Sequence, residues 1–192
     1  MLSTNKQTSS AFRRRPLRKA TTALICCAVL ALAAPIYGAR PQANSRMIES
    51  VRKELATLPY YGVFDNLSFS INGNTVVLSG QVVRASTKSD AEHRVARIEG
   101  VDRVINRIEV LPPSPMDDTI RRRVYQAVFR QDGLYRYAQG ANPSIHIVVN
   151  GGHVSLEGVV SNQMDSQLAY MAANGVPGVF SVTNHLRVEH GS

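Results

Sequence analysis

Two stretches of this chain alternate between hydrophobic and polar residues in the manner of half-buried β-strands. The first stretch runs from Leu67 to Ile71, passes through the turn sequence Asn72-Gly73-Asn74, and resumes from Val76 to Val82. Alternation with a period of two residues places the apolar side chains on one face of a sheet, and an Asn-Gly pair supplies the left-handed backbone of a tight turn. The pattern therefore predicts a β-hairpin.

Helical periodicity brackets this hairpin on both sides. Before it, Met47 to Leu58 carries apolar residues at the spacing of one helix face, and Pro59 ends the helix. After it, Ser86 to Glu99 shows the same periodicity and ends at Gly100, and Val101 to Val110 predicts a third strand. A helical crossover between two strands of one sheet makes them parallel. The prediction is an α-β-β-α-β unit whose three-stranded mixed sheet is covered on one face by two helices.

The same pattern occurs a second time, with a constant offset of 78 residues. The corresponding pairs include Leu67 and Ile145, Phe69 and Ile147, Ile71 and Val149, Leu78 and Leu156, Gly80 and Gly158, Gly100 and Gly178, and Asn106 and Asn184. So many matches in one register indicate an internal repeat. We therefore expect an α+β fold that consists of two small repeated domains.

The repeat also divides the chain into segments. We predict a signal peptide at residues 1–39, a tether at 40–45, a first domain at 46–111, a Pro-rich linker at 112–115 and a second domain at 116–190. In the second domain, Asp117 or Asp118 is expected to cap a helix that reaches Gln131. An insertion at 131–143 follows this helix, and a crossover helix is predicted over residues 162–174.

The first 39 residues have the order of an export signal. A basic stretch precedes twelve consecutive apolar residues, Ala23 to Ala34, and the small pair Gly38-Ala39 follows. This order favours cleavage near Ala39 and a periplasmic location. The alternative is an uncleaved membrane anchor, which would need most of residues 20–37 as one helix. Both cysteines, Cys26 and Cys27, lie in the apolar run, so the mature chain would contain no disulfide or thiol site.

The net charge of +8 is concentrated in the predicted signal. Six of the 22 basic residues precede residue 20, which leaves 16 basic residues against all 14 acidic residues in the rest of the chain. Sequence-independent binding of nucleic acid requires a broad basic surface. Nucleic acid is therefore not an expected partner.

The sequence shows no pattern of catalytic chemistry. The five histidines, His93, His146, His153, His185 and His190, lack the spacing of metal ligands, and no serine lies in a nucleophile elbow. We expect His146 and His185, on strands, to face solvent or to stack at a sheet edge. The prediction is a non-enzymatic protein without a metal or a cofactor.

Several repeated residues are expected to have structural roles. Gly80 falls on the apolar face of its strand, so we interpret it as a place where a helix backbone packs closely on the sheet. Asn106 lies on the apolar side of the third strand and is expected to bind neighbouring backbone through its side chain. The structural set predicted from the repeat comprises Gly80, Gly100, Asn106, Gly158, Gly178 and Asn184.

These residues resemble the BON domain family. The resemblance rests on Val76-Val77-Leu78-Ser79-Gly80-Gln81-Val82, on Ala91, and on the Gly100-Val101 and Asn106 pattern, all with counterparts in the second copy. The resemblance covers nearly all of the chain after the signal. The chain as a whole is similar to exported, osmotically inducible proteins with two BON domains in tandem. The resemblance implies a small α/β domain without established enzyme activity. It also implies a role at the bacterial envelope in binding phospholipid or partner proteins.

The helix predicted from Asp118 to Gln131 suggests where a membrane would be contacted. Its core stripe contains Ile120, Val124, Ala127 and Val128, and the opposite face carries Arg122, Tyr125, Gln126 and Phe129. Aromatic rings flanked by arginines suit the interface of an anionic membrane. The predicted lipid-binding set is Arg121, Arg122, Arg123, Tyr125, Phe129, Arg130, Tyr135, Arg136 and Tyr137.

Two alternatives remain open at this point. Tyr125 and Phe129 could instead be buried against the first domain. The partner could likewise be an envelope protein, bound through a sheet face or edge in an interaction or chaperone-like role.

Overall fold

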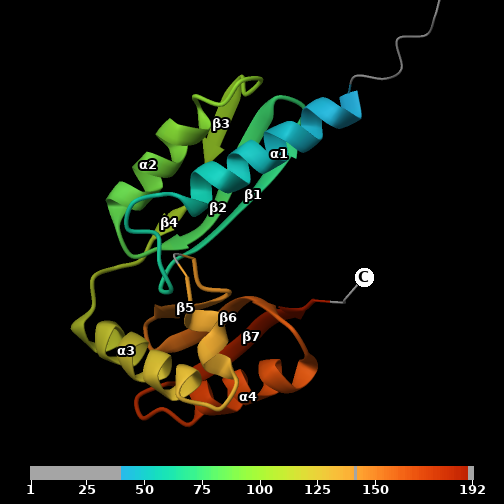
Figure 1. The fold of residues 1–192 in the computed structure, drawn as a ribbon. Helices are drawn as coiled ribbons and strands as arrows, with labels where there is room; N and C mark the ends of the chain where they lie inside the picture. Colours follow the sequence, from blue (N-terminus) through green and yellow to red (C-terminus); the bar gives the residue numbers. More distant parts are fainter. Residues whose placement is uncertain (1–39, 141, 190–192) are drawn as a thin grey trace, which may run out of the picture. The chain divides into compact units, whose positions relative to one another are not determined.

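A computed structural model describes residues 40–140 and 142–189, and the predicted signal peptide lies outside this range. The two α-β-β-α-β units follow each other along the chain (Figure 1). The first unit contains α1 (Arg40–Ala56), β1 (Asn66–Asn72), β2 (Thr75–Val82), α2 (Ala85–Val95), β3 (Arg103–Asn106) and β4 (Glu109–Val110). The second unit contains α3 (Pro115–Phe129), the 3-10 helix η1 (Leu134–Ala138), β5 (Ile145–Asn150), β6 (His153–Val160), α4 (Gln163–Asn174) and β7 (Ser181–Val188).

The sheet topology confirms the predicted α+β repeat. In each unit the hairpin strands are antiparallel, and the last strand lies parallel to the second hairpin strand. The register is also repeated, since Phe69 lies opposite Leu78 in the first sheet and Ile147 lies opposite Leu156 in the second. Each unit has its own hydrophobic core between helices and sheet. Among the described residues, no helix is long and apolar enough to cross a membrane.

The third strand of the first unit differs from its prediction. The sequence predicts one strand from Val101 to Val110, whereas β3 and β4 pair separately with β2 and are interrupted after Asn106. The side-chain oxygen of Asn106 accepts a hydrogen bond from the Ile108 amide at 3.1 Å. The Leu186 amide donates to the Asn184 side chain in the same way at 3.1 Å, yet β7 is continuous, so this bond alone does not explain the interruption.

The two repeated asparagines act as predicted on neighbouring backbone. Asn106 donates to the Lys88 carbonyl at 3.0 Å, and Asn184 donates to the Ser166 carbonyl at 3.1 Å. Each asparagine thus connects the last strand of its unit to the preceding helix. In this structure both side chains therefore bind neighbouring backbone.

Two helix starts were predicted wrongly. Helix α1 begins at Arg40, so the segment predicted as a tether at 40–45 is helical. Helix α3 is capped by Ser114, whose side chain accepts from the Asp117 amide at 3.2 Å, rather than by Asp117 or Asp118. Ser114 precedes Pro115, and a proline is well suited to the first helical position because its missing amide would have no helical partner there.

The reason for the repeated glycine in the second strand also requires correction. Gly80 and Gly158 have φ angles of +117° and +120°. A Cβ atom at Gly80 would lie 2.1 Å from the Asn66 carbonyl oxygen, and at Gly158 it would lie 2.0 Å from that of Ser144. The close approach therefore involves the neighbouring strand, not a helix backbone as predicted.

The segment that precedes β1 packs against the second sheet. The Ile147 amide donates to the Val63 carbonyl at 2.7 Å, and Phe64 packs against the second core. His146 stacks on Tyr61 with 5.4 Å between ring centroids. His146 is only 8% exposed, so of the two expected alternatives it stacks on a ring and does not face solvent. His185 does face solvent, where it pairs with Glu157 at 2.6 Å.

This burial predicts a dependence of stability on pH. Burial lowers the pKa of His146 below the ordinary value of 6.5, although backbone hydrogen-bond partners partly oppose the shift. The unfolded chain then binds the proton more readily than the folded chain. The contribution of neutral His146 to stability is therefore fully present above pH 6.5, its ordinary pKa, and is lost as the pH falls below that value. We expect the free energy of unfolding in urea to decrease between about pH 7 and pH 5.

A His146→Gln variant provides the comparison. Burial raises the pKa of nearby Asp65, which acts in the opposite direction at lower pH. Charged His146 lowers the pKa of Asp65, so its removal in the variant strengthens this opposing effect. We expect a flatter pH profile for the variant between those pH values. Identical slopes for the two proteins would contradict the assignment to His146.

Candidate functional site

Three exposed arginines line the outer side of α3. Arg122, Arg123 and Arg130 are exposed, whereas Ile120, Val124 and Val128 face the core as predicted. The acidic residues exposed on or next to this helix are Asp118 and Asp132, at its two ends. The middle of the helix surface therefore carries a positive charge.

A groove of about 480 Å³ lies between α3 and α4. Arg123 and Arg130 line it together with Met171, Val176 and Pro177. The Arg123 guanidinium donates to the Pro177 carbonyl at 3.4 Å, and both residues line the groove. Met171 is 61% exposed, so the groove also offers an accessible apolar side chain. The groove combines cationic and apolar contacts.

The outer face of α4 extends this surface without adding charge. Its exposed residues are Gln163, Met164, Gln167, Tyr170, Met171 and Asn174. The charged residue of α4, Asp165, is buried and accepts hydrogen bonds from Tyr137 and Asn162. The basic and apolar character of α3 is therefore not neutralised by its neighbouring helix.

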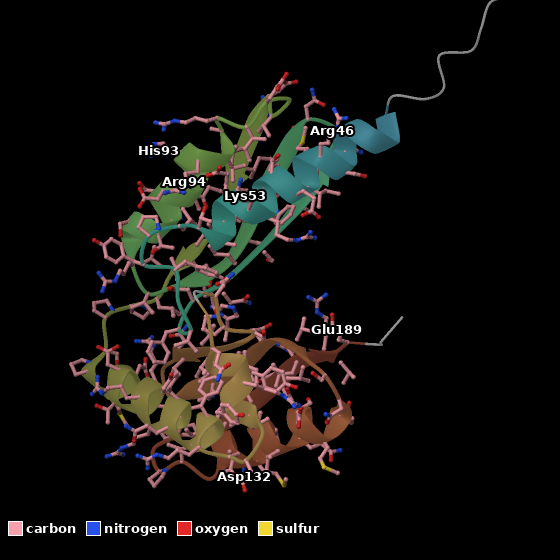
Figure 2. All side chains as sticks on the ribbon, viewed as in Figure 1. Arg46, Lys53, His93, Arg94, Asp132 and Glu189 are labelled. Carbon is pink, nitrogen blue, oxygen red and sulfur yellow. The ribbon has the colours of Figure 1, made fainter. Side chains whose placement is uncertain are left out.

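The helices of the first unit present a different surface. Figure 2 shows Arg46 and Lys53 on α1 and His93 and Arg94 on α2. Acidic residues are interspersed with them, namely Glu49, Glu54, Glu92 and Glu99. Arg94 is paired with Glu54 at 3.4 Å. A surface of mixed charge gives little net attraction for an anion, so the two units differ in their electrostatics although their folds repeat.

Tyr125 lies at the border between the α3 surface and the segment before β1. Its ring contacts Phe64 edge-on at 6.2 Å between centroids and contacts Phe129 at 4.8 Å. A hollow of about 370 Å³ is lined by Val63, Phe64, Arg122, Tyr125 and Gln126. Tyr125 remains 36% exposed. The ring is thus partly buried by the first unit, as one of the two alternatives predicted, and partly accessible.

Three members of the predicted lipid-binding set lie in the interior instead. Phe129 is in the second core because the insertion folds back over the end of α3, where Leu134 and Tyr137 join the same cluster. Arg121 is 3% exposed, pairs with Asp118 and donates to the Val149 carbonyl at 2.7 Å. The predicted exposure of Arg121, Phe129 and Tyr137 was therefore wrong. An insertion without a counterpart in the first unit covers the end of α3, and Arg121 hydrogen-bonds to the β5–β6 hairpin.

Arg136 and Tyr137 form a hydrogen-bond network at the start of α4. The Tyr137 hydroxyl donates to Asp165 at 2.5 Å and accepts from the Ser161 amide at 2.9 Å, and Arg136 pairs with Asp165. Burial raises the pKa of Asp165, but the hydrogen bonds from Tyr137 and Arg136 outweigh it, so the net pKa is lowered. This network ties the insertion to the domain. Of the aromatic residues in the insertion, Tyr135 is the exposed one, at 59%.

The described residues contain no group of three histidine, cysteine, aspartate or glutamate side chains that could hold a metal ion. The exposed members of the predicted set are Arg122, Arg123, Tyr125, Arg130, Tyr135 and Arg136. Sequence reasoning missed Met171, Val176 and Pro177, because their position beside α3 depends on the packing of two helices distant in sequence.

Comparison with known proteins identifies the class of this chain. The BON domain family matches residues 49–112 and again residues 116–190. The chain therefore belongs to the BON domain family and carries two such domains in tandem. BON domains are associated with envelope proteins that bind phospholipid or take part in osmotic stress.

Two solved structures show weaker similarity. One is the C-terminal domain of CdsD, the structural protein of the type III secretion system of Chlamydia trachomatis, with 12% identity over 75% of this chain and 98% of that chain and a TM-score of 0.31. Another structure of CdsD from the same organism has 12% identity, covers 73% of this chain and 91% of that chain, and has a TM-score of 0.29. No curated protein matches the sequence.

Proposed function

We propose that this protein is a non-enzymatic, exported envelope protein that binds anionic phospholipid through the α3–α4 surface. The observation that carries the proposal is the set of three exposed arginines, Arg122, Arg123 and Arg130, beside an apolar groove and an uncharged α4 face. The export signal predicted at residues 1–39 and the BON family membership support a periplasmic location. In that compartment the surface would serve envelope integrity or a stress response.

The chemistry of the surface suits a phospholipid headgroup. A guanidinium group donates two parallel hydrogen bonds to phosphate oxygens, while Met171 and Tyr125 can enter the apolar boundary below the headgroups. Each basic residue near an anionic leaflet contributes about 1 kcal/mol. Binding through three arginines is therefore peripheral, reversible and sensitive to salt, because added ions screen exposed charges.

Vesicle sedimentation tests the proposal. The wild type is expected to bind vesicles of phosphatidylglycerol, to bind phosphatidylcholine vesicles much more weakly, and to be released by high salt. The double variant Arg123→Glu plus Arg130→Glu reverses two charges at the groove. Loss of about 1 kcal/mol for each arginine corresponds to at least about a 30-fold loss of affinity for the anionic vesicles.

A matched control uses two exposed arginines of the first unit. Arg97→Glu plus Arg107→Glu makes the same change in net charge and is expected to weaken binding far less, because only the local surface differs. Equal losses in the two double variants would show non-specific attraction by total charge. Unchanged binding of the groove variant would remove the α3–α4 surface from consideration.

An alternative function is an interaction or chaperone-like role with envelope proteins and no lipid contact. The observation that favours this alternative is the outer edge of β1, with which no described strand pairs. This strand is distant in sequence from the arginines of α3.

A further inference from the structure

The described residues contain four outer strand edges, and three of them are protected. The edge of β5 is covered by Val63, whose carbonyl accepts from Ile147, and by Arg121, which donates to the Val149 carbonyl. The outer strand opposite β1 is interrupted between β3 and β4. The edge strand β7 carries the charged or ionisable residues His185 and Arg187. Proteins protect strand edges by these means because an open edge presents unpaired backbone groups.

The edge strand β1 has none of these protections, apart from the backbone hydrogen bond between Leu67 at its start and the side chain of Tyr61. Its sequence is Asn-Leu-Ser-Phe-Ser-Ile-Asn, seven residues without a charge or a proline. It pairs with β2 on one side, and no described segment pairs with its other side. Figure 1 shows β1 at the margin of the first sheet. An uninterrupted, uncharged edge of this length is suited to accept another extended strand.

The internal repeat identifies which backbone groups face outward. Phe69 lies opposite Leu78 just as Ile147 lies opposite Leu156, so the two residues occupy equivalent positions in the same register. The Ile147 amide points away from its hairpin partner and donates to Val63 at 2.7 Å. The amide of Phe69 must therefore also point outward. The second unit thus shows, within the same chain, that an extended segment can occupy this edge.

A groove of about 590 Å³ lies beside β1 and provides side-chain contacts. Residues 67–71 of β1 line it together with Asn44, Ile48 and Arg52 of α1 and with Arg187. The arginine side chains are exposed, and the pairing of Arg52 with Glu49 is a surface pair of small energy. The groove therefore offers an apolar contact at Ile48 and two positive charges next to the backbone edge.

We propose that β1 is a docking site for an extended, acidic segment of a partner protein, which adds a strand to the first sheet. Backbone hydrogen bonds with Phe69 and Ile71 would provide binding, and Arg52 and Arg187 would select acidic side chains. A second copy of this chain fits less well, because its own β1 carries no acidic side chain to match these arginines. This site is separate from the α3–α4 surface and does not depend on lipid binding.

The probe is a seven-residue peptide of alternating valine and glutamate, and the control is the same peptide with lysine in place of glutamate. Amide hydrogen exchange is followed by NMR during titration with each peptide. We expect the glutamate peptide to slow exchange of the Phe69 and Ile71 amides at least tenfold. The Ser68 and Ser70 amides, which face β2, should be unchanged and serve as internal controls.

Charge reversal tests the selectivity of the groove. We expect Arg52→Glu plus Arg187→Glu to weaken binding of the glutamate peptide about tenfold, while Arg97→Glu plus Arg107→Glu leaves it nearly unchanged. No binding of the glutamate peptide at about millimolar concentration would overturn the proposal. Binding that leaves Phe69 exchange unaltered, or equal binding of the lysine peptide, would do the same. If the Phe69 amide becomes protected from exchange when the protein concentration is raised without peptide, and the measured mass is that of a dimer, the edge belongs to a second copy instead.

Discussion

Replacement of Gly80 by alanine is expected to destabilise the first domain by about 2 to 6 kcal/mol, the combined effect of backbone strain and overpacking. The φ angle of +117° is unfavourable for any residue with a Cβ atom, and that atom would lie 2.1 Å from the Asn66 carbonyl oxygen. Relief requires separation of β1 from β2, since the obstacle is backbone. Urea unfolding measures the loss, and Gly158→Ala should have a similar effect in the second domain.

A control in the same hairpin separates strain from collision. Gly73 has a φ angle of +60°, but a Cβ atom there would meet nothing within 4 Å. Gly73→Ala should therefore cost only the left-handed backbone penalty of about 1 to 2 kcal/mol. Equal losses for Gly73→Ala and Gly80→Ala would mean that the carbonyl of Asn66 moves away at little cost, contrary to the proposed cause.

Replacement of Asp117 by alanine is expected to destabilise the second domain by about 3 kcal/mol, because two hydrogen bonds to a charged acceptor are lost. The Asp117 carboxylate accepts from the Gly151 amide at 2.9 Å and from the Gly152 amide at 2.8 Å. Gly152 is buried, so its amide would remain without a partner in the variant. Urea unfolding again provides the measurement.

Two further variants define the role of this carboxylate. Asp117→Asn keeps one acceptor oxygen and should lose roughly half as much stability. Asp132→Ala removes an exposed acid at the other end of α3 (Figure 2) and should change stability by less than about 0.5 kcal/mol. A loss as large for Asp132→Ala as for Asp117→Ala would show a general charge effect rather than fastening of the hairpin turn.

The candidate lipid surface was only partly predictable. Helical periodicity correctly placed Ile120 and Val124 inside and Arg122 outside, because these residues lie in the regular middle of α3. Helical periodicity wrongly placed Phe129 on the exposed face. Periodicity describes the faces of an isolated helix and does not show which segment covers its end. The insertion that buries Phe129 has no counterpart in the first unit, so the repeat contained no signal for it.

The sequence by itself determined the repeated α+β fold, the two hairpins, and the expectation that Asn106 and Asn184 bind neighbouring backbone. These features depend on local patterns that occur twice at one offset. Only the tertiary structure showed that Gly80 avoids a neighbouring strand, that Arg121 reaches the Val149 carbonyl, and that the segment before β1 covers the edge of β5. Each of these contacts joins segments distant along the chain. Their geometry is set by how helices and strands pack, which hydrophobic periodicity does not encode.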